Sequence, residues 1–327
     1  MTRWNQVLSV LLVIQIVLAI AMLWPQSTVS SAEAGPLLPG FDAGQVVSLT
    51  LTDSEGNHVT LAKASEGWVL PEAGDYPADG EKVSSLLDKL GSIQTNRQVT
   101  RTASSHKRLK VAEDDFVRLI EFALANGETH KVFVGSSPRT SATHVRADNQ
   151  PETYLTADLP SYEVSASAAR WIDTLYYTVP QTDTVALTLE NENGRFEFER
   201  DGEQWVMAGL DSDEEFDQSA FNSLLGQVTS LRMLEPIGKE EEPSFELDQP
   251  RATMTLKMGD GQTHTLYVGA KEEEGARYVA KWSESPYYVW IAEYTADNLM
   301  NKTRQDFIAE PATPTPTPET DSGSDGG

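Results

Sequence analysis

The side chains of this sequence best suited to chemistry are five histidines, together with one run of closely spaced carboxylates. The histidines are His58, His106, His130, His144 and His264. His130 and His264 recur in two similar segments, each beside threonine, without acidic or cysteine neighbours at the spacing of a metal site. Such a setting is typical of a residue on the surface of a strand, so we assign no metal to them.

The carboxylate run places Asp211, Asp213, Glu215 and Asp217 at alternate positions, as the first half of a calcium loop does. Phe216 stands where that loop needs glycine, and Asn222 stands where it needs a bidentate glutamate. We therefore expect a solvated loop that leads into a helix. The sequence also lacks the nucleophile-elbow, P-loop, dinucleotide-binding and zinc-peptidase motifs. It assigns no catalytic residue and no cofactor, and it leaves an enzymatic activity open.

One segment, between Arg97 and Lys110, is basic in an otherwise acidic chain. It holds five cations and no carboxylate: Arg97, Arg101, Lys107, Arg108 and Lys110. A cluster of this kind suits an acidic partner or the surface of an anionic membrane. These residues are our candidate partner surface.

The chain as a whole carries 25 Lys and Arg against 50 Asp and Glu, and most of the acidic excess falls in residues 181–308. Nucleic acid needs a cationic surface, so we expect no nucleic-acid partner. The sequence contains no cysteine, which excludes both a disulfide framework and an acylated-cysteine anchor. Each folded part must therefore be stable through its own core.

An uncharged apolar run from Val7 to Trp24 is the element that we expect to position the rest of the chain relative to the membrane. As a helix it is about 27 Å long, close to the hydrocarbon thickness of a bilayer. Arg3 precedes the run and no cation follows until Lys63, which puts residues 1–6 in the cytoplasm and the body outside. We expect an uncleaved single-pass anchor over residues 7–24 in the cell membrane. Signal-peptidase cleavage at Ala32-Glu33-Ala34 is the alternative.

Two low-complexity stretches flank the folded part. Residues 25–44 are rich in Pro, Gly, Ser and Ala, which predicts a flexible stalk. Residues 309–327 alternate Thr with Pro and end in acidic, Gly and Ser residues, which predicts a disordered tail. The length that remains is enough for two domains.

Residues 45–180 and 181–308 resemble each other at a nearly constant spacing. The segment Gly127 to Gly135, GETHKVFVG, matches Gly261 to Gly269, GQTHTLYVG, and Trp68-Val69 matches Trp205-Val206. We therefore predict a tandem duplication, with both tryptophans buried at equivalent places.

The basic segment matches an acidic one that contains Glu235, Glu240, Glu241, Glu242 and Glu246. The two segments could face each other, the basic one could dock a partner or the membrane, or their charges could have drifted.

Alternating residues predict the secondary structure of each copy. Met254, Leu256 and Met258 alternate with polar residues before a Gly-Asp-Gly turn, which indicates a hairpin. The equivalent stretch DDFVRLIEFALANG should then be a strand, although alone it also fits a helix. Each copy is predicted to contain three strands, a helix, a stretch without a clear pattern, four strands and a short helix near Ser165 to Leu175 or Thr295 to Met300. This order predicts an α+β fold with mainly antiparallel sheets, preceded by one transmembrane helix.

These features together resemble the bacterial domain-of-unknown-function 4340 family. The resemblance rests on the anchoring helix, the twin copies, the two Trp-Val motifs, Tyr76-Pro77-Ala78-Asp79 before a helix, and Trp171-Ile172-Asp173. The second copy departs from it, with Glu215-Phe216-Asp217 in place of the Tyr-Pro-Ala-Asp motif. Members often accompany ABC-type export systems of the gliding-motility kind, so the resemblance implies an accessory role at the cell envelope and no catalytic residues.

The sequence thus favours a non-enzymatic, membrane-anchored extracytoplasmic protein that binds a partner, plausibly subunits of an ABC-type transporter. An envelope hydrolase is the main alternative and would need converging carboxylates in a cleft. A glycan-binding module is a further alternative and would need an exposed aromatic patch.

Overall fold

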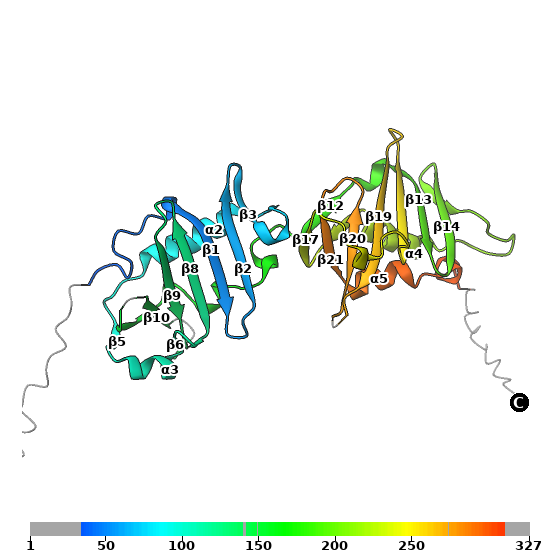
Figure 1. Cartoon of the computed structure of the whole chain (residues 1–327). Coiled ribbons are helices and arrows are strands. Elements are labelled where there is room, and N and C mark those ends of the chain that lie inside the picture. Colours follow the sequence, from blue (N-terminus) through cyan, green and yellow to red (C-terminus); the bar gives the residue numbers. More distant parts are fainter. Residues whose placement is uncertain (1–33, 140–141, 149, 274, 311–327) are drawn as a thin grey trace, which may run out of the picture. The chain divides into compact units, whose positions relative to one another are not determined.

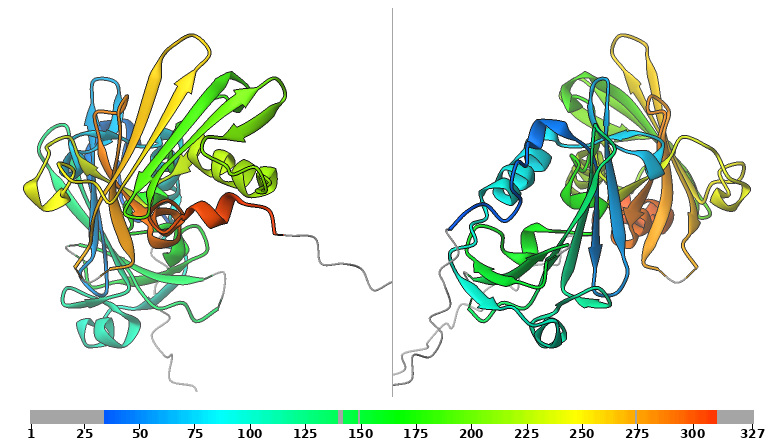
Figure 2. Two further views of the ribbon diagram at one scale, coloured as in Figure 1. Left: turned by 90° about the vertical axis from the view of Figure 1, so that its right-hand side faces the viewer. Right: turned by 60° about the vertical axis from the view of Figure 1, so that its left-hand side comes forward.

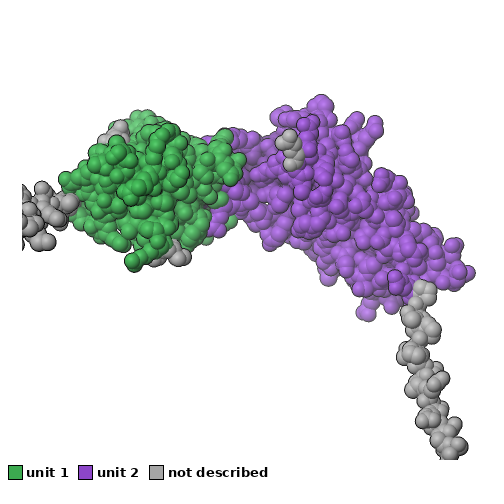
Figure 3. Space-filling model, turned by 90° about the horizontal axis from the view of Figure 1, so that it is seen from below, with its two compact units in different colours: residues 1–58, 81–166 green, residues 59–80, 167–327 purple. Residues whose placement is uncertain are grey.

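The computed structural model describes residues 34–310 except for residues 140, 141, 149 and 274. The chain divides into two compact units (Figure 3): unit 1 holds residues 1–58 and 81–166, and unit 2 holds residues 59–80 and 167–327. The predicted membrane segment, residues 7–24, and the tail beyond residue 310 lie outside the described residues. No helix that the structure describes has the length and apolar character needed to cross a bilayer.

Two large sheets dominate the described residues (Figure 1). The first has nine strands in the order β4-β3-β2-β1-β8-β9-β10-β11-β5, and the second has eight in the order β15-β14-β13-β18-β19-β20-β21-β17. The pairings of β1 with β8 and of β13 with β18 are antiparallel, as are those of the hairpins that flank them. The prediction of mainly antiparallel sheets with few short helices is confirmed.

The strands of the first sheet are β1 (Val46–Asp53), β2 (His58–Ala64), β3 (Gly67–Leu70), β4 (Tyr76–Pro77), β5 (Gln98–Thr100), β8 (Arg118–Leu124), β9 (Thr129–Val134), β10 (Thr143–Ala147) and β11 (Thr153–Thr156). Those of the second are β13 (Thr184–Asn191), β14 (Gly194–Asp201), β15 (Gln204–Met207), β17 (Glu235–Gly238), β18 (Ala252–Met258), β19 (Thr263–Lys271), β20 (Arg277–Trp282) and β21 (Tyr288–Ala292). Two small ladders pair β6 (Val111–Ala112) with β7 (Asp115–Phe116) and β12 (Leu175–Thr178) with β16 (Ser230–Arg232). The α-helices within the described residues are α2 (Gly80–Ser92), α3 (His106–Leu109), α4 (Gln218–Val228) and α5 (Glu293–Met300).

The ambiguous segment DDFVRLIEFALANG forms strand β8, as its counterpart predicted. Ile120 and Phe122 alternate into the core, and the chain then turns at Gly127, whose φ of 89° favours glycine. The Gly127 N–H donates to Leu124 O at 2.9 Å and closes the turn.

Helices α2 and α4 lie beside the sheets (Figure 2), and each buries an apolar stripe. The buried residues are Val83, Leu86, Leu87 and Leu90 on α2 and Phe221, Leu224, Leu225 and Val228 on α4. They follow the spacing of an amphipathic helix. Asp217 caps α4, because its Oδ1 accepts hydrogen bonds from the N–H groups of Ser219 and Ala220, each at 2.9 Å. The second copy's departure from the Tyr-Pro-Ala-Asp motif therefore leaves its helix start intact.

The short helix predicted near Ser165 to Leu175 is wrong. Only a 3₁₀ turn, Ala168–Arg170, forms there, and β12 begins at Leu175. The Asp173 side chain accepts a hydrogen bond from the Leu175 N–H at 2.9 Å, which turns the backbone away from helix. In the second half, α5 forms where a short helix was predicted.

Two backbone details recur in the two halves of the chain. Lys110 and Glu246 both adopt the left-handed conformation, with φ of 58° and 53°. Gly135 and Gly269 each pass close to a backbone carbonyl, Leu109 O and Phe245 O respectively, where a Cβ atom would collide. Non-glycine residues rarely adopt positive φ, so the first coincidence is a specific structural match.

The Trp prediction is confirmed for Trp205 and wrong for Trp68. Trp205 is 6% exposed and packs its ring 4.7 Å from that of Phe221, whereas Trp68 is only half-buried. The first copy has Val83, a much smaller side chain, at the position of Phe221.

Replacing Trp205 with alanine should therefore lower the free energy of unfolding by about 3–5 kcal/mol, because a buried ring leaves a cavity. Trp68→Ala should lower it clearly less. Urea unfolding monitored by far-UV circular dichroism measures both, and equal losses would contradict the difference in burial.

Gly135→Ala and Gly269→Ala should each lower the free energy of unfolding by about 1–3 kcal/mol, because the added methyl group overpacks the site. Gly80→Ala is the matched control, since nothing lies within 4 Å of a Cβ added there. The same unfolding assay decides, and a glycine variant as stable as the control would refute the collision.

Candidate functional site

The five residues of the candidate partner surface lie around β5 and α3. Arg97 and Arg101 flank β5, Lys107 and Arg108 lie on α3, and Lys110 follows it. Lys107 Nζ lies 2.7 Å from Asp114 Oδ2, and Lys110 Nζ lies 2.8 Å from Asp115 Oδ1. The hydrogen bond between Lys107 and Asp114 raises the pKa of the lysine and lowers that of the carboxyl group.

The other three cations are free to meet a partner. Arg97, Arg101 and Arg108 are exposed, and they form no ion pair within the part of the chain that the structure describes. The structure thus narrows the candidate surface from five cations to three.

The opposite charges of the two copies are partly a local exchange of partners. Lys110 pairs with Asp115, five residues on, and the equivalent Glu246 pairs with Arg251, also five residues on, at 3.0 Å. The two pairs have opposite polarity, so each half of the chain has one ion pair at this left-handed position. Glu235 pairs with Arg277, and Glu241 accepts a hydrogen bond from the Tyr288 hydroxyl at 3.0 Å. Burial, together with that hydrogen bond, raises the pKa of Tyr288 to about 12.

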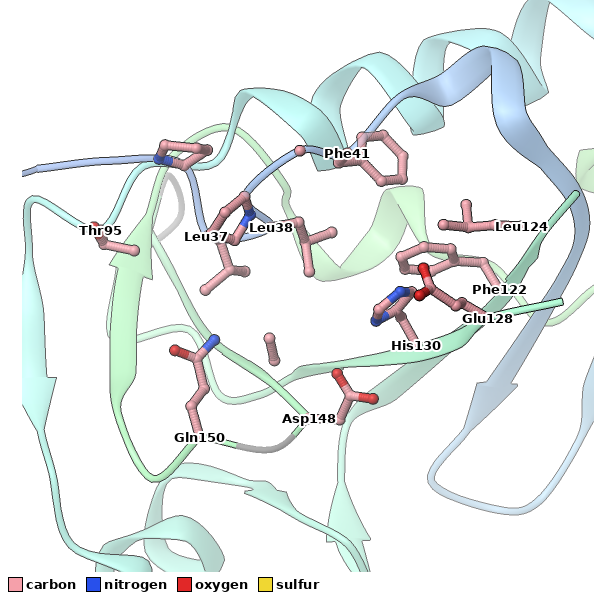
Figure 4. A pocket seen from close by; sticks show the side chains of 14 residues that line it. Leu37, Leu38, Phe41, Thr95, Phe122, Leu124, Glu128, His130, Asp148 and Gln150 are labelled. Atoms are coloured by element: carbon pink, nitrogen blue, oxygen red, sulfur yellow. The ribbon is translucent and has the colours of Figure 1, made fainter. Parts of the chain in front are cut away.

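A concave site of about 420 Å³ lies in unit 1 (Figure 4). Its walls come from Leu37, Leu38 and Phe41 before β1, from Phe122 and Leu124 at the end of β8, from Glu128 and His130 of the next hairpin strand and its turn, and from Asp148 and Gln150 after β10. We call it pocket A. Its size is in the range of small-ligand sites.

Several contacts fix the walls of pocket A. The Leu37 N–H donates to Ile93 O at 2.8 Å, and Thr95 exchanges hydrogen bonds with Gly35. Phe41 meets Phe122 edge-on at 5.4 Å between ring centroids, and the His130 ring lies 5.3 Å from that of Phe122. The residues of the predicted stalk that the structure describes are therefore packed at this site.

A second concave site, pocket B, has about 570 Å³ and lies in unit 2. It is lined by Val179, Pro180, Thr182, Asp183, Val185, Met258, Gly259, Asp260, Gln262 and His264. The His264 ring stacks on Trp282 with 5.6 Å between centroids. Its Nδ1 is buried and makes no hydrogen bond in the described residues, with Glu284 Oε1 3.5 Å away.

Pockets A and B overlap in position within their sheets. The equivalent lining residues are Phe41 and Val179, Leu124 and Met258, Glu128 and Gln262, and His130 and His264, whereas only pocket A extends to the segment after β10. Each lies between the segment that leads into the first strand, β1 or β13, and the hairpin β8–β9 or β18–β19. One backbone hydrogen bond joins these parts in both: Ala125 N–H to Gln45 O at 2.8 Å, and Gly259 N–H to Asp183 O at 2.7 Å. The recurring histidine, His130 or His264, lines each pocket.

The two pockets share some chemistry and differ in the rest. Each combines apolar walls with carboxylates, and neither has Lys or Arg among its lining residues. The carboxylates stand at different positions. Gln262 replaces Glu128, and Ser283 replaces Asp148, because the N–H of each donates at 2.8 Å to an equivalent carbonyl, Thr265 O or Lys131 O. An apolar group beside a neutral or cationic one suits both pockets, whereas an acid–base pair is not common to them.

Sequence reasoning placed both histidines correctly on strands but missed the pockets. His130 and His264 are half-buried rather than on an open surface. Their recurrence in the Gly-x-Thr-His segments was the available signal. Among the described residues, no cluster of His, Cys, Asp or Glu is arranged to hold a metal ion.

Two mainly antiparallel sheets, each with a pocket lined by the recurring histidine, define a two-unit β-rich protein. The model of the family described as "Domain of unknown function (DUF4340)" matches residues 68–244 and 235–312. The chain belongs to the DUF4340 family. Comparison with curated proteins and with solved structures found no match.

The ion pair between Lys110 and Asp115, which has the opposite polarity in the second half, can be tested with a double-mutant cycle. Lys110→Glu should lower the free energy of unfolding by up to about 1 kcal/mol, because the introduced carboxylate would face that of Asp115. Adding Asp115→Lys should restore the loss, since it recreates the arrangement of the second copy. Denaturant unfolding at low and high salt measures the coupling, and a double variant no more stable than Lys110→Glu would contradict the exchange.

Proposed function

We propose that this chain is a non-enzymatic, membrane-anchored extracytoplasmic binding protein that acts as an accessory to an ABC-type envelope transport complex. The apolar run at residues 7–24 supports the anchor, and the resemblance to DUF4340 proteins found beside export systems supports the partner. The body, residues 45–308, is a tandem duplication of one α+β unit. The left-handed Lys110 and Glu246, the paired glycines and the shared helix stripes support the duplication.

The observation that carries the binding role is the equivalence of pockets A and B. A duplicated fold that keeps a pocket and its histidine in both copies fits two binding sites better than a chance hollow. The chemistry of the walls suggests what they bind. Apolar walls with carboxylates and no cation suit a peptide segment that presents an apolar side chain next to a Lys or Arg.

An envelope hydrolase is the second candidate, because Glu128 and Asp148 line one pocket. Two carboxylates in one cleft are the arrangement that glycoside hydrolysis uses. Pocket B lacks both carboxylates at the equivalent positions, so a hydrolase would work in one copy only. A glycan-binding module has less support, since the exposed tyrosines Tyr162 and Tyr294 belong to different units.

Site-specific photo-crosslinking tests the binding role in the full chain. A photoreactive phenylalanine analogue replaces Leu38 in pocket A or Gln262 in pocket B, and the control site is Ser54 in the exposed turn after β1. We expect adducts with transporter subunits from the two pocket sites, identified by mass spectrometry after detergent extraction. Adducts that are no more abundant than at Ser54 would overturn the proposal.

The anchor has its own test. Sequencing the mature amino terminus should find the unprocessed chain in the membrane fraction. Soluble chains that begin at Gly35 would show cleavage instead.

The hydrolase candidate predicts that Glu128→Gln and Asp148→Asn abolish turnover of envelope glycans, whereas the binding role predicts no turnover in the unmodified protein.

A further inference from the structure

The first residues of unit 1 that the structure describes lie beside the basic segment. Gly35 and Thr95 are joined by three hydrogen bonds of 2.8–3.1 Å, and Pro36 forms a β-bridge with Gln94. Arg97 follows directly after this junction. The basic segment therefore starts next to the first described residues of unit 1.

The proposed anchor limits how far this junction can lie from the membrane. At most about 3.6 Å per residue, the chain from Trp24 to Gly35 spans no more than about 40 Å. This limit rests on the proposed function, since it requires residues 7–24 to be in the bilayer. Within it, the basic segment is held at high local concentration near the lipid headgroups.

Strand β5 shows a surface suited to lipid headgroups. Exposure alternates along it: Arg97, Val99 and Arg101 are exposed, with Val99 at 44%, while Gln98 and Thr100 are half-buried. The pairing of β5 with β11 shifts register at Val99, so the placement rests on exposure: two exposed arginines flank an exposed apolar side chain at this bulge. Arg108 on the neighbouring α3 adds a third unpaired cation. An apolar group between cations is a composition typical of membrane interfaces.

We propose that Arg97, Val99, Arg101 and Arg108 form a contact with the anionic headgroups of the membrane that holds the anchor. We call this set the β5 surface. The chain carries a net charge of −25, so an anionic membrane repels most of it. A local cationic surface next to the tether then sets which side of unit 1 faces the lipid. Electrostatic attraction and the tether act together, as two weak membrane signals do.

The test uses the full chain in nanodiscs, with lipid charge as the variable. The protein has no cysteine, so Ser104→Cys provides a single labelling site between Arg101 and Arg108, and Ser54→Cys provides a control site in the same unit. Energy transfer from the label to an acceptor on the lipid headgroups reports proximity. We expect higher transfer from position 104 in nanodiscs with phosphatidylglycerol than in phosphatidylcholine alone, and a loss of the difference in high salt.

Charge variants identify the residues responsible. Arg97→Gln, Arg101→Gln and Arg108→Gln together should reduce the transfer to its value in neutral lipid. The matched control removes three exposed cations of unit 2, with Arg200→Gln, Arg232→Gln and Lys257→Gln, and should leave it unchanged. Unfolding midpoints verify that each variant remains folded.

The outcomes separate this contact from the anchor. Release of the chain from the membrane by alkaline carbonate would overturn the anchor, and it would also overturn the proposed contact of the β5 surface with lipid headgroups. The contact alone would be overturned if the chain stays in the membrane but the energy transfer from position 104 does not depend on lipid charge. The same conclusion would follow if the triple Arg variant left the transfer unchanged. If that variant instead loses its crosslinks to transporter subunits, the β5 surface binds an acidic protein and the membrane contact is wrong.

Discussion

The antiparallel pairing of each copy's first strand with a strand far along the chain is the constraint on which the rest depends. It joins Val46 to Leu124 in the first sheet and Thr184 to Met258 in the second. Each pairing shifts register at its start, next to the hydrogen bond that ties the incoming segment to the hairpin turn. The hollow between segment and hairpin follows from this geometry, which is why both copies have one.

Local patterns in the sequence were enough to predict the strands, the hairpin turns and the helix stripes. Alternation at Ile120 and Phe122 and the turn at Gly127 depend on residues close in sequence. Comparison of the two copies also resolved the ambiguity of β8, because only a strand fits both. Lys110 and Glu246 both adopt a left-handed conformation at equivalent positions. The similarity of the two halves therefore extends from sequence to backbone conformation.

What the sequence could not predict depends on residues distant along the chain. Pocket A requires Leu38 and Phe41 to fold back onto the hairpin, although their composition suggests a stalk. The half-burial of Trp68 depends on which side chains surround it. The pairing of Lys107 with Asp114 removes charge from a segment that contains no acid of its own. Charge counted along a sequence therefore overstates charge that is available at a surface.

The segment that forms one wall of pocket A is also the segment through which the chain leads to its amino terminus. Any pulling force applied there reaches unit 1 first at Gly35 and Thr95, and then at Leu37, whose side chain is buried. Mechanical load would peel this wall from the sheet before it reached β1. Pocket A would then open under tension, whereas none of the residues that line pocket B belongs to this segment, so the two sites would differ in their response to force.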